Sequence, residues 1–194
     1  CRPAGRACGT EHAVVVSSGT AALHLAVLAL GIGPGDEVIV PAYTFPATAN
    51  VVALEGLRPV LVDVDPVTMN VDPSRIEVGP RTKAIIAVHL FGRPSALDEL
   101  PSELLLVEDA AGALGARRGG RACGGLGLCG CLSFHPRKIV TTGEGGAVTT
   151  NDAAFAEAVR SMRHHGWSSG DMPSPGLNYR LSDILCAVGI PQVA

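Results

Sequence analysis

Lys138 lies in a stretch of the chain where a lysine could do chemistry that an arginine could not. The chain has only two lysines, Lys83 and Lys138, against thirteen arginines. Lys138 follows an apolar run at 126–134 and precedes a Gly-rich turn that leads into a second apolar segment. A partly buried lysine can lose its proton and attack a carbonyl as a free amine, whereas arginine stays charged. The alternative is a half-exposed loop lysine without a chemical role.

A second candidate is the sequence Ser18-Gly19-Thr20, which separates a short apolar run from an Ala- and Leu-rich segment. Such a junction predicts a strand followed by a helix. The free N–H groups of a first helical turn and the positive end of the helix dipole form a natural phosphate cradle. The hydroxyl of Ser133 could donate to the same phosphate. Many strand-to-helix turns carry Ser and Gly only as caps, so that alternative stays open.

Glu108 and Asp109 follow a predicted strand at 104–107, and strand ends are where open α/β sheets place ligands. A carboxylate there can cap the next helix. It can also lie at the base of a pocket as the ionised partner of a protonated heteroaromatic nitrogen. A phosphate cradle, such a carboxylate and a lysine that forms a Schiff base are together what pyridoxal 5'-phosphate requires. The combination is more specific than any one of its parts.

Short β-branched runs alternate with helical segments and must position these residues. Strands are predicted at 12–17, 37–40, 60–64, 84–88 and 104–107, and helices at 21–30, 46–54, 95–100, 153–162 and 181–190. Apolar runs that do not alternate with polar residues, separated by helices, indicate a parallel sheet covered on both faces. The predicted fold class is α/β, a three-layer α/β/α sandwich with a mostly parallel central sheet. The segment 163–178 is polar and rich in Gly and Pro, which predicts a loop.

Composition narrows the functional classes. Apolar residues make up 47% of the 194 residues and aromatic residues only 4%, so aliphatic side chains must fill the core. A net charge of −3 argues against nucleic acid as the main partner. We expect no membrane contact, because no apolar run reaches spanning length and no signal peptide opens the chain. The six cysteines show no CxxC pair. They predict buried, reduced thiols in a cytoplasmic protein rather than a metal site at Cys123, Cys129 and Cys131.

Ordered blocks along nearly the whole chain resemble the large domain of the DegT-type sugar aminotransferases, pyridoxal-phosphate enzymes of the aspartate aminotransferase fold. The blocks are His12-Ala13-Val14 with Ser18-Gly19-Thr20-Ala21-Ala22-Leu23, Gly33-Pro34-Gly35-Asp36-Glu37-Val38, Pro41-Ala42-Tyr43-Thr44-Phe45, Val62-Asp63-Val64-Asp65, Val88-His89-Leu90-Phe91-Gly92, Glu108-Asp109-Ala110-Ala111, Ser133-Phe134-His135 through Lys138, Gly143-Glu144-Gly145-Gly146 and Asn178-Tyr179-Arg180. With so many blocks in the same order, the chain is identified as a member of this family.

The resemblance implies the chemistry. Lys138 would form the internal aldimine with the cofactor and then shuttle the proton during transamination. Asp109 would keep the pyridine nitrogen protonated, which makes the ring an electron sink. The implied reaction transfers an amino group, usually from glutamate, to a keto group of a nucleotide-linked sugar. A related dehydratase or cyclitol aminotransferase is the alternative on this fold, although dehydratase branches that replace the lysine with histidine are disfavoured by Lys138.

The resemblance also implies how the cofactor is held. The matched cofactor-binding positions are Ser18, Gly19, Thr20 and Ser133 at the phosphate, and Phe45, which would stack on the ring. Asn178 would reach the cofactor phosphate of the neighbouring subunit. The site would then be shared across a homodimer.

Some features depart from the family pattern. Gly112 stands where the family usually carries Gln or His, and Pro191 falls where a helix normally continues. The chain opens with Cys1 and closes at Ala194, and we expect the counterpart of the family's smaller C-terminal domain to be absent. We therefore expect residues 1–194 to be one cofactor-binding large domain, truncated at both ends, which could be a catalytically incompetent fragment that still binds the cofactor.

Several other polar residues allow two interpretations. His135 could act in acid–base chemistry, but a packing or hydrogen-bonding role within its motif is favoured. His164 and His165 are expected at a solvated helix end. Arg117 and Arg118 could attract a substrate diphosphate or could simply lie on a solvated loop.

Overall fold

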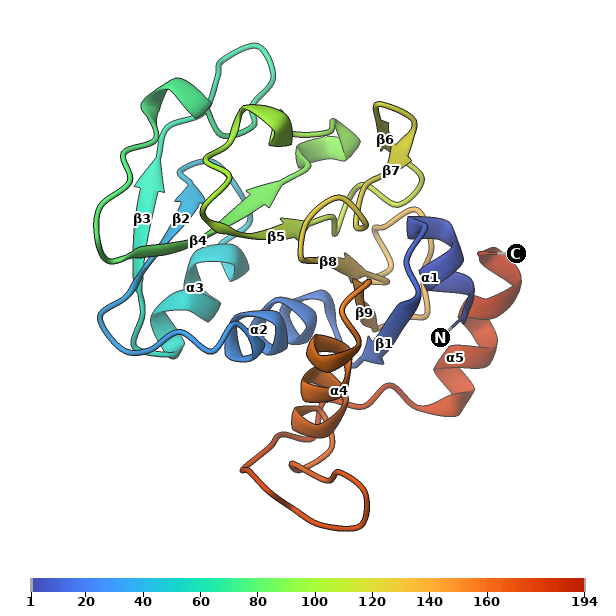
Figure 1. Ribbon diagram of the computed structural model, residues 1–194. Coiled ribbons are helices and arrows are strands. Elements are labelled where there is room, and N and C mark those ends of the chain that lie inside the picture. Colours follow the sequence, from blue (N-terminus) through green and yellow to red (C-terminus); the bar gives the residue numbers. More distant parts are fainter. Residues whose placement is uncertain (1, 194) are drawn as a thin grey trace.

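A seven-stranded sheet runs through the molecule in the computed structural model, which describes residues 2–193 (Figure 1). The strand order is β1-β9-β8-β5-β4-β2-β3. The strands are β1 (His12–Val16), β2 (Glu37–Pro41), β3 (Arg58–Val62), β4 (Thr82–Val88), β5 (Leu105–Asp109), β8 (Cys129–Ser133) and β9 (Gly146–Thr150). Five of them, from β8 to β3, are parallel, whereas β9 is antiparallel to both β8 and β1. The predicted α/β class with a mostly parallel sheet is confirmed.

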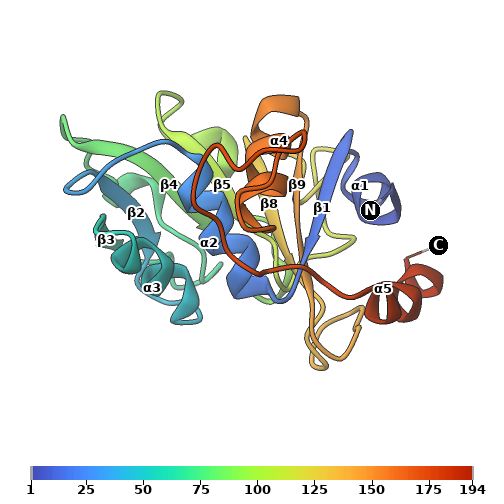
Figure 2. The same ribbon diagram turned by 90° about the horizontal axis from the view of Figure 1, so that it is seen from below.

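Three helices cover one face of this sheet. They are α2 (Gly19–Ala29), α3 (Ala47–Leu54) and α4 (Ala153–Met162), and all three lie in front of the strands in Figure 2. The opposite face is covered by α1 (Arg2–Cys8), by the 3₁₀ turns and by irregular connections such as 110–126, which pack against side chains of the alternate strand residues. The last helix, α5 (Asp183–Gly189), lies beside α1 at the β1 edge of the sheet. The structure therefore has three layers, although the second outer layer contains little regular helix.

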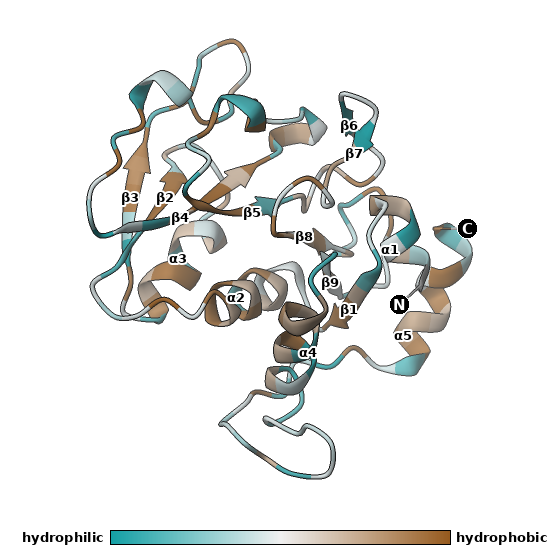
Figure 3. Ribbon diagram, viewed as in Figure 1, coloured by the Kyte–Doolittle hydropathy of each residue, from teal (hydrophilic) through white to brown (hydrophobic). Residues whose placement is uncertain are grey.

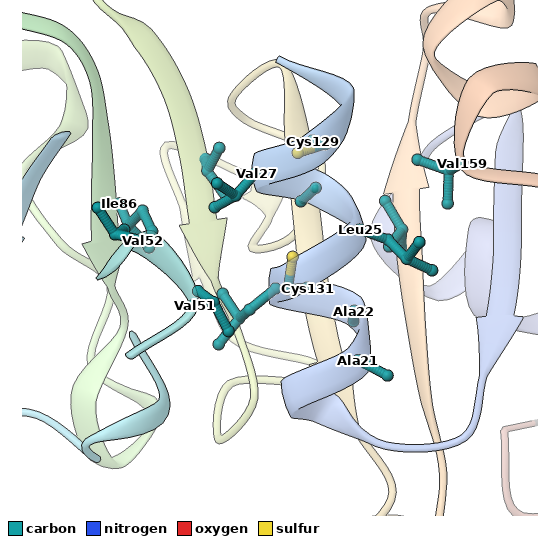
Figure 4. Packing of buried hydrophobic residues seen from close by; sticks show 14 of the residues in the cluster. Ala21, Ala22, Leu25, Val27, Val51, Val52, Ile86, Cys129, Cys131 and Val159 are labelled. Atoms are coloured by element: carbon teal, nitrogen blue, oxygen red, sulfur yellow. The ribbon is translucent and has the colours of Figure 1, made fainter. Parts of the chain in front are cut away.

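Helix α2 packs in the centre of the helical face. Its side chains are mostly Ala, Leu and Val, which favour helix or fill the core without polar atoms. Figure 4 shows Leu25 on the side of α2 that faces Val159 of α4, with Val51 and Val52 of α3 on the other side. Alanines such as Ala22 are fully buried on this face, and their small side chains let the helix approach the strands closely.

Some elements differ from the prediction. The helix expected at 95–100 is only a 3₁₀ turn, η3 (Leu97–Glu99), and β3 begins and ends two residues before the strand expected at 60–64. Neither α1 nor the small hairpin of β6 (Arg117–Arg118) and β7 (Arg121–Ala122) was predicted. The remaining 3₁₀ turns are η1 (Pro73–Arg75), η2 (Leu90–Gly92) and η4 (Ile190–Gln192). The segment expected to be helical to residue 190 ends as α5 at Gly189, and Pro191 lies inside η4.

The side chains sort as the composition predicted. Figure 3 shows apolar strands inside and polar connections outside. The described cysteines are free thiols, and four of them, Cys8, Cys123, Cys129 and Cys131, are buried. Within residues 2–193, no helix is long and apolar enough to cross a bilayer.

Candidate active site

Three segments that are distant in sequence meet at the ends of β5 and β8. Asp109 is the last residue of β5 and Ser133 the last of β8, and the two strands are parallel. The start of α2 lies directly against the end of β8, because a Cβ atom on Gly19 would come 2.7 Å from the Cβ of Ser133. Only glycine allows this approach. These residues therefore lie at the carboxyl ends of parallel strands, which is where open α/β sheets place ligands.

The beginning of α2 presents unpaired donors. Ser18 is the N-cap, and its Oγ accepts a hydrogen bond from Ala21 N–H at 3.0 Å. Among residues 2–193, the N–H groups of Gly19 and Thr20 have no recorded acceptor, as expected for a first helical turn. The hydroxyl of Ser133 lies beside them and accepts only a long bond of 3.4 Å from His135 N–H. Ser18 therefore acts as the cap, while the neighbouring groups are free to bind an anion.

Asp109 is a buried carboxyl, 6% exposed, with two donors. Its Oδ2 accepts from Thr48 Oγ1 at 2.9 Å and its Oδ1 from Ala111 N–H at 3.2 Å. Burial raises the pKa of Asp109, and this rise is only partly opposed by those bonds and by the nearby charge of Lys138. The helix-cap alternative for Asp109 is wrong, because residues 110–116 form turns and no helix. A buried carboxyl with spare lone pairs is suited to a cationic partner.

Lys138 lies at the end of a tight turn after β8. Its N–H donates to the carbonyl of His135 at 2.9 Å, and its ammonium is near enough to Asp109 to lower the pKa of that carboxyl. No ion pair with a carboxylate is recorded for its half-buried side chain within residues 3–193. His135 Nδ1 accepts from Arg137 N–H at 3.2 Å, which is a hydrogen bond within the motif of the kind that the sequence favoured.

Phe45 and Asn178 are not joined to this group by any recorded contact among the described side chains. Phe45, in the connection between β2 and α3, is 70% exposed. Asn178 is exposed and forms an isolated bridge with His164 in the loop that follows α4. The next residue, Tyr179, accepts from Ser17 N–H at 2.8 Å, which anchors this loop beside the start of α2. His165 lies in the same loop with φ of 59°.

Two threonines were missed by sequence reasoning. Thr48 is fully buried in α3 and donates to Asp109, and its Oγ1 lies 3.2 Å from Thr44 Oγ1. The two hydroxyls fix one oxygen of the carboxyl in place. Thr44 precedes α3, so no helical periodicity links the two threonines in the sequence, and the contact with Asp109 depends on the fold.

Glu108, the neighbouring acid at the same strand end, has a different role from Asp109. Its side chain points to the opposite face of the sheet and is fully buried there. Oε2 accepts from His89 Nε2 at 2.9 Å and from Gly124 N–H at 2.8 Å, while Oε1 accepts from Leu126 and Gly127 N–H at 2.6 and 2.7 Å. Glu108 thus holds the loop before β8 and lies outside the candidate site.

His89 is neutral in this arrangement. Ser95 N–H donates to His89 Nδ1 at 3.0 Å, so Nδ1 carries a lone pair and the single ring proton is on Nε2. Burial works to raise the pKa of the Glu108 carboxyl. Donation by His89 and by the N–H groups of Gly127 and Gly124 outweighs burial and lowers that pKa.

Comparison with known proteins places these features in context. The profile described as the DegT/DnrJ/EryC1/StrS aminotransferase family matches residues 4–194. The GDP-perosamine synthase of Caulobacter vibrioides is 47% identical over 196 residues, which cover 96% of this chain and 53% of that protein. The chain therefore spans about half the length of the curated relative that it matches.

Solved structures agree in fold. S. venezuelae DesV, in complex with a ketimine intermediate, has a TM-score of 0.94 and 40% identity over 99% of this chain and 54% of DesV. DesI, solved in the presence of its TDP-sugar product, has a TM-score of 0.91 and 40% identity over 99% of this chain and 50% of DesI. 3-Amino-5-hydroxybenzoic acid synthase has a TM-score of 0.94 and 36% identity over 99% of this chain and 53% of that enzyme.

Proposed function

The chain belongs to the DegT/DnrJ/EryC1/StrS aminotransferase family, and from that premise we propose that it transfers an amino group to a keto group of a nucleotide-linked sugar. The proposed cofactor is pyridoxal 5'-phosphate and the proposed amino donor is glutamate. The observation that carries the proposal is the meeting of Lys138, Asp109 and the free donors of Gly19 and Thr20 at one sheet edge. The names of two relatives, a GDP-perosamine synthase and DesI with its TDP-sugar product, support the substrate class.

The residues present fit this cofactor. Phosphate carries negative charge, and the first turn of α2 with Ser133 offers N–H and hydroxyl donors at the positive end of a helix. Gly146 lets the start of β9 pack closely against the residue that caps α2, since a Cβ there would come 2.5 Å from the carbonyl oxygen of Ser18. When bound, the cofactor supplies an electron sink for charge that develops at the amino-bearing carbon.

The chain's own side chains then have distinct tasks. Asp109, oriented by Thr48, would hold a proton on the pyridine nitrogen, because the cation and the buried carboxylate stabilise each other. Lys138 Nζ would attach the cofactor and, as a free amine, move the proton at the reacting carbon. Phe45 would cover one face of the ring, which its exposed side chain permits.

We propose further that the site is completed in a homodimer. Asn178 lies on the surface, on a loop whose neighbouring residue is hydrogen-bonded beside the start of α2. It would donate to the cofactor phosphate of a second subunit. Two large apolar side chains are exposed close to site residues and support an interface that covers them. Ile139 follows Lys138, and Phe91 lies two residues after His89, whose N–H donates to the carbonyl of Asp109.

Incubation with a panel of keto-sugar nucleotides and glutamate tests the activity. The expected products are 2-oxoglutarate, measured by a coupled assay, and an aminated sugar nucleotide, detected by mass spectrometry. The matched control is Lys138→Arg, which keeps the charge but supplies no free amine. Elimination products without amine would instead indicate a dehydratase, and amination of a cyclitol alone would overturn the substrate class.

A further inference from the structure

A basic hollow lies between α1, the β6–β7 hairpin and the residue that follows β9. Its volume is about 410 Å³. Three arginines, Arg6, Arg117 and Arg121, line it together with Asn151, and no Asp or Glu does. The hollow lies within the size range of small-molecule sites, roughly 300–1,000 Å³.

This hollow is separate from the candidate active site. Asn151 follows β9 at the point where Thr150 pairs with Cys129, the first residue of β8. Ser133, which belongs to the candidate active site, is the last residue of β8. Four residues of strand separate the two ends, which is roughly 13 Å. The arginines therefore do not serve the cofactor site.

The charges in the hollow are uncompensated. Among residues 3–193, no ion pair with a carboxylate is recorded for Arg6, Arg117 or Arg121. Arg118, in the same hairpin, differs because its Nε donates to Asp98 Oδ1 at 2.6 Å and it also pairs with Glu99. The sequence analysis gave Arg117 and Arg118 the same two interpretations. In the structure only Arg118 is paired with carboxylates.

Two of the guanidinium groups are held in place by the backbone. Arg117 Nη1 donates to Gly120 O at 2.8 Å, and Arg121 Nη2 donates to Gly125 O at 3.0 Å. Each guanidinium has five N–H donors, so most of them remain free. Planar forks of this kind match phosphate oxygens in pairs. A single carboxylate would leave two of the three charges uncompensated, whereas a diphosphate group carries comparable negative charge.

We propose that this hollow binds a small diphosphate-bearing anion at a site distinct from the active site. The inference stands on the arginines alone and is independent of the aminotransferase function. The ligand class comprises inorganic pyrophosphate and nucleoside diphosphates, which share the group that the arginines recognise.

Calorimetric titration with inorganic pyrophosphate tests the site. The cofactor is first fixed in the protein with borohydride and the excess removed, so that the donors of Gly19 and Thr20 are occupied. We expect one bound anion per chain. Arg117→Gln and Arg121→Gln should each weaken binding at least tenfold, because each removes charge-assisted hydrogen bonds. Arg118→Gln, the matched control in the same hairpin, should bind as the wild type does.

Separate titrations with GDP and TDP show whether a nucleoside adds affinity to the shared diphosphate group. Absence of binding, or an equal loss in Arg118→Gln, would overturn the proposal. If borohydride fixes no cofactor, the same titration on the untreated protein still tests the proposal.

Loss of binding in Ser133→Ala, with full binding in both arginine variants, would assign the anion to the cofactor cradle and refute the proposed site in the hollow. Circular dichroism of each variant confirms that it is folded.

Discussion

Lys138 Nζ is the single amine that we expect to carry the cofactor. The other lysine, Lys83, is exposed, and its Nζ donates to the carbonyl of Pro80 at 2.8 Å. Treatment of the loaded protein with borohydride should fix the cofactor to Lys138, as read by peptide mass spectrometry, and the visible absorbance should disappear. Lys138→Arg should show neither effect, because arginine does not deprotonate. Label recovered on Lys83 would refute the assignment.

The buried carboxylate of Asp109 is expected to support turnover and to lower the stability of the cofactor-free protein. Asp109→Asn should bind the cofactor but lose several orders of magnitude in turnover, because an unprotonated pyridine is a poor electron sink. Unchanged turnover would remove Asp109 from the mechanism.

The pKa of Asp109 also predicts how stability depends on pH in the cofactor-free protein. Because burial raises this pKa in the folded state, the folded protein holds the proton more tightly than the unfolded chain does. The contribution of Asp109 to stability is therefore present below its ordinary pKa and is lost as the pH rises through the raised value. Asp109→Asn should raise the melting temperature of the cofactor-free protein at neutral pH, and the gain should shrink in acid. A gain that does not vary with pH would contradict this cause.

The residue scale also shows where sequence reasoning stops. Glu108 and Asp109 are adjacent acids at a strand end, and period-2 alternation dictates that only one of them faces the site. The sequence alone does not say which face holds the cofactor, so the resemblance had to select Asp109. Thr48 was missed for a similar reason. A buried hydroxyl is recognised only when its acceptor, here a carboxylate 61 residues away, is brought to it by the fold.

At the scale of elements, Glu108 links three segments: the connection after β4 through His89, β5 itself, and the loop 124–127 before β8. Glu108→Gln replaces an acceptor with an NH₂ group that meets donors. It should lower the free energy of unfolding by about 3 kcal/mol, measured by urea denaturation. Glu157→Gln is the control, since Glu157 forms only an exposed pair with Arg160 in α4.

The pH dependence of this effect has the opposite sign to that of Asp109. The pKa of Glu108 is lowered in the folded state, so its stabilisation is present above the ordinary glutamate pKa and is lost as the pH falls through the lowered value. The difference in unfolding free energy between wild type and Glu108→Gln should therefore shrink in acid. A constant difference would show that packing, rather than charge, causes the loss.

Elements were predictable where their sequences are long or strongly apolar. The parallel strands and α2 follow from β-branched runs and from an Ala/Leu-rich segment. The hairpin β6–β7 has two residues per strand, and α1 contains a glycine and a proline, so neither carries a periodic signal. The antiparallel direction of β9 was not predicted either, because it depends on the short connection through the turn that holds Lys138. Local propensity does not encode strand direction.

At the scale of the whole molecule, a site shared between two subunits predicts that two inactive variants can restore activity to each other. A site built within one chain does not predict this. If Asn178 serves the neighbouring subunit, Lys138→Ala and Asn178→Ala impair different halves of each shared site. A mixed dimer then contains one site with both defects and one site with neither. A site built within a single chain would gain nothing from mixing.

We therefore expect activity to return when the two inactive variants are mixed in equal amounts, unfolded and then refolded together. Random pairing makes half of the dimers mixed, so recovery should approach about a quarter of the wild-type rate. Each variant refolded alone is the control, and light scattering measures the mass of the assembly. Lys138→Ala mixed with Asp109→Asn should show no recovery, because both residues lie in the same half of the site. Recovery in that second mixture, or a monomeric mass with full activity, would contradict the shared site.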